Sequence, residues 1–263
     1  MSSLDELFVR TRAEGRAALI GYLPAGFPSY EGAVAALLAM VEAGVDAVEV
    51  GMPYSDPLME GPVIQAAHKV ALDNGTSTQD VLRTVRAASQ TGAPVLVMGY
   101  WNPVHHYGFA RWARDLKAAG GAGAITPDLI PEEATVWLAA TREHDLDPIF
   151  LVAPSSTDER IAVVGRANRG FVYAASTMGV TGARGAVGAR ARELVTRTRA
   201  QTDLPVCVGL GVSNGDQAAE VAAFADGVIV GSALVTALSD RGVDGVRRLA
   251  ADLAEGVRRV PVR

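Results

Sequence analysis

The chain has 263 residues, of which 49% are hydrophobic and 20% charged, a balance that excludes a disordered or fibrous protein. Its formal net charge of −5 argues against general binding of nucleic acids or acidic membranes. A single cysteine, Cys207, excludes an internal disulfide framework. We interpret this thiol, which lies in an apolar run, as a core residue and not as a nucleophile.

The N-terminal residues from Met1 to Glu14 are polar and charged and lack the apolar segment of a secretion signal. No stretch of the chain approaches the roughly 20 apolar residues that cross a bilayer. We therefore expect a cytoplasmic protein that binds no membrane.

Short apolar segments alternate along the chain with longer, alanine-rich segments of helical period. Each short segment is nearly all apolar, which is typical of a parallel strand buried on both faces. The expected strands, in chain order, are Ala17 to Gly21, Ala47 to Gly51, Val95 to Tyr100, Gly123 to Thr126, Ile149 to Val152, Gly170 to Ala174, Val206 to Gly209 and Gly227 to Val230.

Helices are expected before and between these strands. They include, in chain order, Ser3 to Arg12, Tyr30 to Ala43, Val81 to Gln90, Phe109 to Ala119, Pro131 to Glu143, Asp158 to Arg166, Ala189 to Ala200, Asp216 to Phe224 and Val243 to Gly256. Eight strands and eight helices in strict alternation predict an α/β fold, a single (β/α)₈ TIM barrel domain over residues 1–263 with an extra N-terminal helix. A doubly wound open sheet is the main alternative.

Glu49 interrupts the otherwise apolar second strand near its C-terminal end, where barrels of this kind carry their chemistry. Alternation with Val48 and Val50 predicts that its side chain faces the barrel interior. A buried carboxylate is costly unless its pKa rises or it finds partners, and a carboxyl that titrates near neutrality suits a general acid–base. The alternative is a structural glutamate in an ion pair.

The loop that follows this strand is rich in prolines, which restrict the backbone and stiffen it. It carries two acids, Asp56 and Glu60, so it can hold a second carboxylate near Glu49. The alternative is a solvated surface loop with ordinary turn residues.

Glycine-rich loops follow the last three strands, at Ser176 to Gly188, Gly209 to Asn214 and Gly231-Ser232. Small residues there allow backbone N–H groups and helix N-termini to approach an anion, and barrels often bind phosphate in this region. We favour a phosphate site over simple tight turns, and we expect the segment from Met178 to Gly188 to close over bound substrate. The alternative is a loop that is simply ordered or always open.

A metal site is not expected. The histidines lack a cysteine or carboxylate cluster at ligand spacing. They are His68, His105, His106 and His144, and the pair His105-His106 is predicted to lie in a surface loop.

Several of these segments resemble the signatures of the tryptophan synthase alpha subunit family. The match covers nearly the whole chain in order. It includes Gly21 to Pro28, Glu49 to Gln65, Tyr100 to Pro103, Pro127 to Leu129, Val180 to Gly182, Val208 to Ser213 and Val230 to Ser232.

The resemblance implies a (β/α)₈ barrel that splits indole-3-glycerol phosphate into indole and glyceraldehyde 3-phosphate without a metal or organic cofactor of its own. By resemblance, Glu49 is the general acid–base, and Glu60 is the second acid, which stabilises positive charge on the indole ring. Tyr173 helps to position the substrate, and Thr181 couples the mobile loop to the second acid.

The same resemblance implies the rest of the substrate site. The positions that match the indole pocket are Tyr22, Tyr100 and Leu210, and those that match the phosphate site are Gly182, Gly211, Gly231 and Ser232.

The implied partner is a beta subunit that carries pyridoxal phosphate, in an αββα complex. Indole would pass to it directly. The residues that match the meeting surface are Tyr54, Asp56, Pro127 and Asp128.

The chain departs from the family at Glu60, where the family has aspartate, and also at Met59 and Gly99. One more methylene matters, because a shift of about 1 Å can cost roughly 100-fold in rate. Three hypotheses remain: an alpha subunit that acts within the complex, a stand-alone lyase that releases free indole, and a non-catalytic partner that modulates a beta subunit.

Overall fold

The computed structural model describes residues 1–175, 184–209 and 211–259. Its parallel strands form one sheet ordered β5-β4-β3-β2-β1-β9-β8-β7-β6. Their bounds are β1 Ala18–Pro24, β2 Ala47–Gly51, β3 Val95–Met98, β4 Gly123–Ile125, β5 Asp147–Ile149, β6 Leu151–Val152, β7 Val172–Ala175, β8 Val206–Gly209 and β9 Gly227–Val230.

The two ends of this sheet, β5 and β6, are separated in sequence by a single residue, Phe150. They are two pieces of one strand, of which the first pairs with β4 and the second with β7. The sheet therefore closes into an eight-stranded barrel, and the predicted TIM-barrel fold is confirmed.

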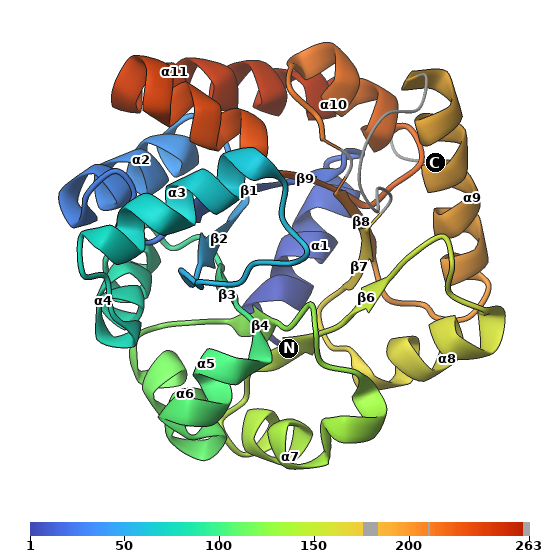
Figure 1. The fold of residues 1–263 in the computed structure, drawn as a ribbon. Coiled ribbons are helices and arrows are strands. Elements are labelled where there is room, and N and C mark those ends of the chain that lie inside the picture. The colour runs from blue at the N-terminus through green and yellow to red at the C-terminus, as the bar shows by residue number, and fades with distance from the viewer. Residues whose placement is uncertain (176–183, 210, 260–263) are drawn as a thin grey trace.

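Helices surround the barrel, as Figure 1 shows. They are α1 Ser3–Ala13, α2 Tyr30–Glu42, α3 Pro62–Asp73, α4 Thr78–Ser89, α5 Trp101–Tyr107, α6 Phe109–Ala118, the 3₁₀ turn η1 Pro131–Glu133, α7 Thr135–Glu143, α8 Asp158–Ala167, α9 Arg184–Arg199, α10 Gly215–Ala222 and α11 Ser232–Arg258, which is kinked at Gly242.

Two packed regions hold the fold together. One fills the layer between strands and helices. The other lies inside the barrel, where strand residues such as Ala47 and Cys207 meet Leu4, Leu7 and Phe8 of α1. The extra N-terminal helix thus closes one end of the barrel, and Cys207 is a fully buried core residue, as expected.

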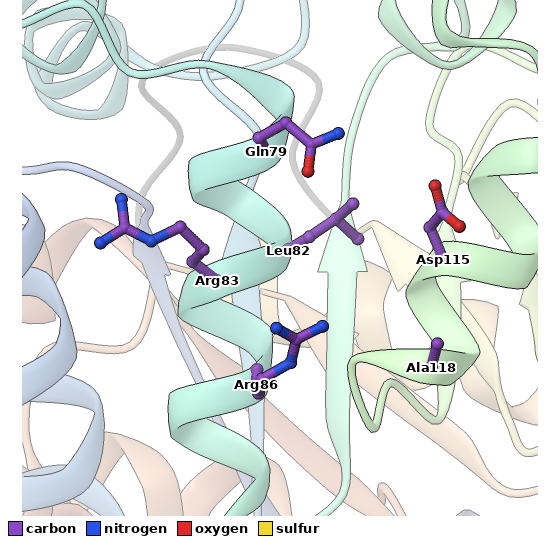
Figure 2. A pocket seen from close by; sticks show the side chains of 6 residues that line it. All are labelled: Gln79, Leu82, Arg83, Arg86, Asp115 and Ala118. Atoms are coloured by element: carbon purple, nitrogen blue, oxygen red, sulfur yellow. The ribbon is translucent and has the colours of Figure 1, made fainter.

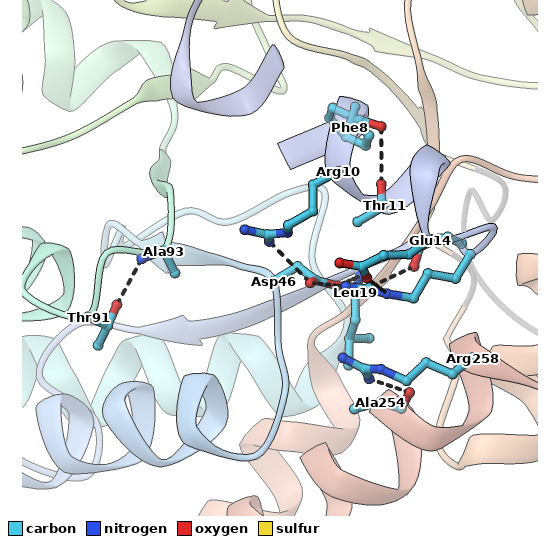
Figure 3. A network of polar contacts seen from close by, with 12 residues as sticks. Phe8, Arg10, Thr11, Glu14, Leu19, Asp46, Thr91, Ala93, Ala254 and Arg258 are labelled. Carbon is cyan, nitrogen blue, oxygen red and sulfur yellow. Dashed lines mark hydrogen bonds and ion pairs between the residues drawn. The ribbon is translucent and has the colours of Figure 1, made fainter. Parts of the chain in front are cut away.

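The N-terminal end of the barrel also carries a buried ion pair. The guanidinium of Arg16 donates two hydrogen bonds to Asp46, at 2.7 and 2.8 Å, and the backbone N–H of Leu19 donates a third at 2.9 Å. Figure 3 shows Arg10, Glu14 and Leu19 gathered around Asp46. The buried charge of Asp46 therefore has close partners, and these contacts tie the start of β2 to the start of β1.

Two helices, α3 and α5, and the part of α11 before its kink at Gly242 were not predicted. The buried face of α3 is formed by Ala67, His68 and Ala71, an apolar pattern too weak to stand out in the sequence. The pair His105-His106 lies in the short helix α5 and not in a loop, although both side chains are exposed. The backbone N–H of Trp101, at the N-terminus of α5, donates to the carboxylate of Asp128. Because Asp128 is distant in sequence, the residues around Trp101 contain no capping signal that predicts the helix.

Helix α9 begins at Arg184, so residues 184–188 of the predicted closing loop are helical. The rest of that loop, residues 178–183, lies outside the described residues.

Candidate active site

Glu49 is fully buried at the C-terminal half of β2. It has the same parity along the strand as Ala47, which lies in the barrel interior, so the predicted inward direction is confirmed. Neither carboxyl oxygen has a hydrogen-bond partner among the described residues. Burial raises the pKa of Glu49 from 4.5 to about 8, so the carboxyl titrates close to neutrality. No described residue forms an ion pair with Glu49, which argues against the alternative of an ion-paired structural glutamate.

Two tyrosines share the interior with Glu49. Tyr22 is its register partner on the neighbouring strand β1, and Tyr173 reaches in from β7. Burial, reinforced by the negative charge of the two glutamates, raises the pKa of both phenols well above 10. Both hydroxyls therefore stay protonated.

Glu60 lies in the loop between β2 and α3 and is half-buried. The hydroxyl of Tyr100, which follows β3, donates a hydrogen bond to Oε2 of Glu60, and the backbone N–H of Met59 donates to the same hydroxyl at 2.8 Å. Burial raises the pKa of Glu60, and the bond from Tyr100 opposes that rise because it favours the charged form. The two predicted acids are thus held in different environments, one without partners and one with a donor.

The Glu60 loop is braced from both sides. The side-chain amide of Gln65 donates to the backbone oxygens of Pro57 and Glu60, at 3.2 and 2.9 Å. The ring of Tyr54 stacks on Tyr100, with 5.0 Å between ring centroids. The loop is therefore an ordered part of the site.

The other predicted meeting-surface residues lie at the same end of the barrel. Asp56 is exposed in the β2–α3 loop, and Pro127 and Asp128 follow β4. Asp128 accepts a hydrogen bond from the backbone N–H of Trp101 at 2.8 Å, and burial raises its pKa. Their role toward a partner stays a prediction.

The predicted phosphate residues that are described lie at the ends of late strands. Gly231 precedes the first turn of α11, and Ser232 opens that helix, so the free N–H groups of this turn face the C-terminal end of the barrel. Gly211 follows β8 with φ of +63°, a conformation that favours glycine. The remaining predictions, Thr181, Gly182 and Leu210, fall outside the described residues.

Sequence reasoning missed one residue that contacts the predicted site residue Tyr22. His68 of α3 is buried, and its Nε2 lies 2.9 Å from the hydroxyl of Tyr22. Burial lowers its pKa to about 4, so the ring is neutral at ordinary pH. A signal was available, since His68 is four residues after Ile64 and three before Ala71 and so shares their face of α3.

A groove of about 260 Å³ lies outside the barrel between α4 and α6. Figure 2 shows Gln79, Leu82 and Arg86 on the side of α4 that faces Asp115 of α6, whereas the side chain of Arg83 points away from it. It is lined mainly by charged and polar side chains and contains none of the predicted site residues.

Within the described ranges, no group of three or more histidine, cysteine, aspartate or glutamate residues could hold a metal ion. None of the described helices is long and apolar enough to cross a membrane.

Comparisons with known proteins identify the family of the chain. The sequence model of the family described as "Tryptophan synthase alpha chain" matches residues 8–260. The chain is 59% identical over 261 residues to the tryptophan synthase alpha chain of Nocardia farcinica, covering 99% of this chain and 98% of that one. It is also 59% identical over 257 residues to the corresponding chain of Mycobacterium tuberculosis, covering 98% and 95%.

Solved structures give the same result. A structure of Mycobacterium tuberculosis tryptophan synthase in space group F222 superposes with a TM-score of 0.93 at 58% identity, covering 98% of each chain. The tryptophan synthase subunit alpha of Legionella pneumophila superposes with a TM-score of 0.91 at 32% identity, covering 99% of this chain and 100% of that one.

Proposed function

The chain belongs to the tryptophan synthase alpha chain family, and from that premise we propose that it performs the alpha reaction through Glu49 and Glu60. That reaction is the cleavage of indole-3-glycerol phosphate into indole and glyceraldehyde 3-phosphate, a carbon–carbon lyase step of L-tryptophan biosynthesis. The observation that carries the assignment of roles is the buried, unpartnered carboxyl of Glu49 with its pKa of about 8.

Glu49 would act first as an acid and then as a base. Its protonated carboxyl donates a proton to the indole ring carbon that bears the glycerol chain, and its carboxylate accepts the proton of the adjacent glycerol hydroxyl. The carbon–carbon bond then breaks, which leaves an aldehyde on one product and restores the aromatic indole. The proton count balances, so Glu49 returns to its starting state.

Glu60 would stay ionised and accept a hydrogen bond from the ring nitrogen as that nitrogen becomes positively charged. The hydrogen bond from Tyr100 supports this role, because it favours the carboxylate over the acid. Glutamate in place of the family's aspartate is compatible with the role, since its longer side chain still reaches a partner on the neighbouring strand end.

The substrate would lie across the C-terminal end of the barrel. Tyr22, Tyr100 and Tyr173 offer aromatic walls and protonated hydroxyls, and the region of Gly211, Gly231 and Ser232 offers N–H groups for the phosphate. Thr181, Gly182 and Leu210 complete this proposal from the family resemblance.

The family implies a beta subunit as partner, and we propose an αββα complex in which the beta subunits hold pyridoxal phosphate. The meeting surface would include Tyr54, Asp56, Pro127 and Asp128. Leu58, in the same loop, is 89% exposed, an apolar side chain that a partner would cover.

The test is cleavage of indole-3-glycerol phosphate by the purified chain, alone and with a beta subunit added. Weak activity that rises strongly with the partner supports the proposal. Strong activity of the chain alone identifies a free-indole lyase. Absence of cleavage in both conditions overturns the proposal and favours the non-catalytic partner.

A further inference from the structure

Helix α3 rests on the barrel mainly through small side chains. Its fully buried residues are Ala67, His68 and Ala71, so the imidazole is the one large side chain in that buried set. Alanine side chains bury little apolar area, and the other side chain of α3 that packs against the core, Ile64, is only partly buried. A directional contact from His68 is therefore a candidate for fixing where α3 lies on the barrel.

That directional contact goes to Tyr22. The Nε2 atom of His68 and the hydroxyl of Tyr22 are 2.9 Å apart, and both side chains are buried. The Nδ1 atom of His68 has no partner among the described residues. The hydrogen bond to Tyr22 is thus the polar contact by which this imidazole is oriented, and its loss would leave a buried hydroxyl and a buried ring nitrogen unpaired.

The surroundings of Tyr22 are shaped to let its hydroxyl reach α3. A Cβ atom on Gly51 would lie 2.3 Å from that hydroxyl, and one on Gly231 would lie 3.3 Å from the ring. Two glycines at the ends of β2 and β9 therefore make room for the ring. One is two residues beyond Glu49, and the other adjoins the proposed phosphate site.

Helix α3 also carries the Glu60 loop. It begins at Pro62, only two residues after Glu60, and its N-cap Gly61 makes no side-chain capping bond. The loop is instead fastened to the helix by Gln65, which donates to the backbone oxygen of Glu60 at 2.9 Å. Because Gln65 and His68 belong to the same helix, a movement of α3 on the barrel moves the Glu60 backbone with it.

We propose that His68 is a positioning residue whose hydrogen bond with Tyr22 fixes α3, and through it Glu60, relative to Glu49. This inference rests on the proposed function for its catalytic consequence. It gives Tyr22 a second role, as the partner of His68, besides its proposed place in the substrate pocket. It also adds His68 to the site as a residue that does not touch the reacting atoms.

The test compares two substitutions of similar size. His68→Gln keeps a side-chain amide that can bond the Tyr22 hydroxyl, whereas His68→Leu keeps the packing but loses the bond. We expect His68→Leu to lower kcat for indole-3-glycerol phosphate by between about 10- and 100-fold, with KM changed by less than about 3-fold, because Glu60 acts in the transition state. His68→Gln is expected to stay within about 3-fold of the wild type in kcat.

A second measurement does not depend on catalysis. Amide hydrogen exchange of residues 54–61, without substrate, should be faster in His68→Leu and in Tyr22→Phe than in the wild type, and unchanged in His68→Gln. If the wild type cleaves no substrate, the proposed function fails while this measurement still tests the positioning role.

Two results would overturn the inference. One is wild-type kcat together with wild-type exchange in His68→Leu. The other is a loss in His68→Gln as large as that in His68→Leu, since the bond would then not be the cause. If His68→Leu does not fold, Tyr22→Phe removes the same bond from the other side and is tested by hydrogen exchange, because Tyr22 also lines the proposed substrate pocket and its effect on kcat would not isolate the bond.

Discussion

Asp46 and Glu49 are two buried carboxyl groups on the same short stretch of chain, and they are treated in opposite ways. Asp46 precedes β2 at the N-terminal end of the barrel and accepts three close hydrogen bonds, two from Arg16 and one from Leu19. Glu49, three positions later and facing the C-terminal end, accepts none from the described residues. Proximity in sequence therefore says little about the role of a buried acid.

The difference shows that one buried acid stabilises the fold and the other is kept available for proton transfer. A paired, hydrogen-bonded charge can be buried without forcing its neutralisation, whereas an unpartnered one responds by a raised pKa. At Asp46 the partners tie α1, β1 and β2 together. At Glu49 the absence of partners produces a carboxyl that can both give and take a proton near neutral pH. Breaking each arrangement should therefore have a different consequence.

The largest expected effect is on catalysis at Glu49. Glu49→Gln keeps the size of the side chain but cannot transfer a proton, so we expect kcat to fall by roughly 1,000-fold or more. Phosphate binding should be retained, because the glycine-rich loops are untouched. Glu42→Gln, on the exposed outer face of α2, is the matched control and should cleave normally. Near-normal turnover in Glu49→Gln would refute the assigned mechanism.

The next effect is on stability at Asp46. Asp46→Asn leaves the buried guanidinium of Arg16 without its main counter-charge, so we expect the free energy of unfolding to fall by about 3 kcal/mol. Denaturant unfolding measures this value. Asp73→Asn removes the acid of an exposed pair with Lys69 and should change stability by less than about 1 kcal/mol. Equal losses of stability in the two variants would mean that the buried pair of Asp46 and Arg16 stabilises the fold no more than an exposed pair does.

The two residues also differ in how far the sequence alone could predict them. The strands and the inward direction of Glu49 follow from local alternation, because β2 is short and apolar on both sides of it. The partners of Asp46 and Glu60 do not, since Arg16 and Tyr100 are 30 and 40 positions away. Contacts of that range are set by the closed barrel, which no local pattern encodes.

The missed helices have the same explanation. Helix α5 is capped by Asp128 from the next strand end, and α3 is anchored by His68 on Tyr22, 46 positions away. A pattern within either helix reports neither contact. The sequence therefore predicted the barrel and Glu49 better than it predicted the side chains that orient Glu60.

A third prediction concerns pH and stability at Glu49. Its pKa is raised from 4.5 in the unfolded chain to about 8 in the native chain. Between these two pH values the native chain therefore keeps a proton on Glu49 that the unfolded chain has released. The contribution of Glu49 to the free energy of unfolding therefore falls as the pH rises from about 4.5 to about 8. Glu49→Gln removes that loss, so its advantage over the wild type should grow by roughly 2 kcal/mol between pH 6 and pH 8. Urea unfolding at the two pH values measures it, and a constant difference would show that Glu49 is not neutral in the native chain.

The smallest expected effect falls on Glu60, whose single side-chain donor places it between the two extremes. Tyr100→Phe removes the hydroxyl that favours the charged form, so the pKa of Glu60 should rise further above its ordinary value. If Glu60 must be ionised, kcat should fall by about 10-fold near neutrality, since hydrogen bonds to charged groups contribute about 1.5–3 kcal/mol.

The sign of that rise predicts the pH profile. A higher pKa for Glu60 means that a larger share of the enzyme is protonated, and inactive, at low pH. The deficit of Tyr100→Phe should therefore be larger at pH 6 than at pH 8. Tyr107→Phe supplies the matched control, because its hydroxyl donates to Asp115 at 2.7 Å on the outside of the barrel and should not affect cleavage. A deficit that is equal at both pH values would assign Tyr100 to holding the substrate and not to keeping Glu60 charged.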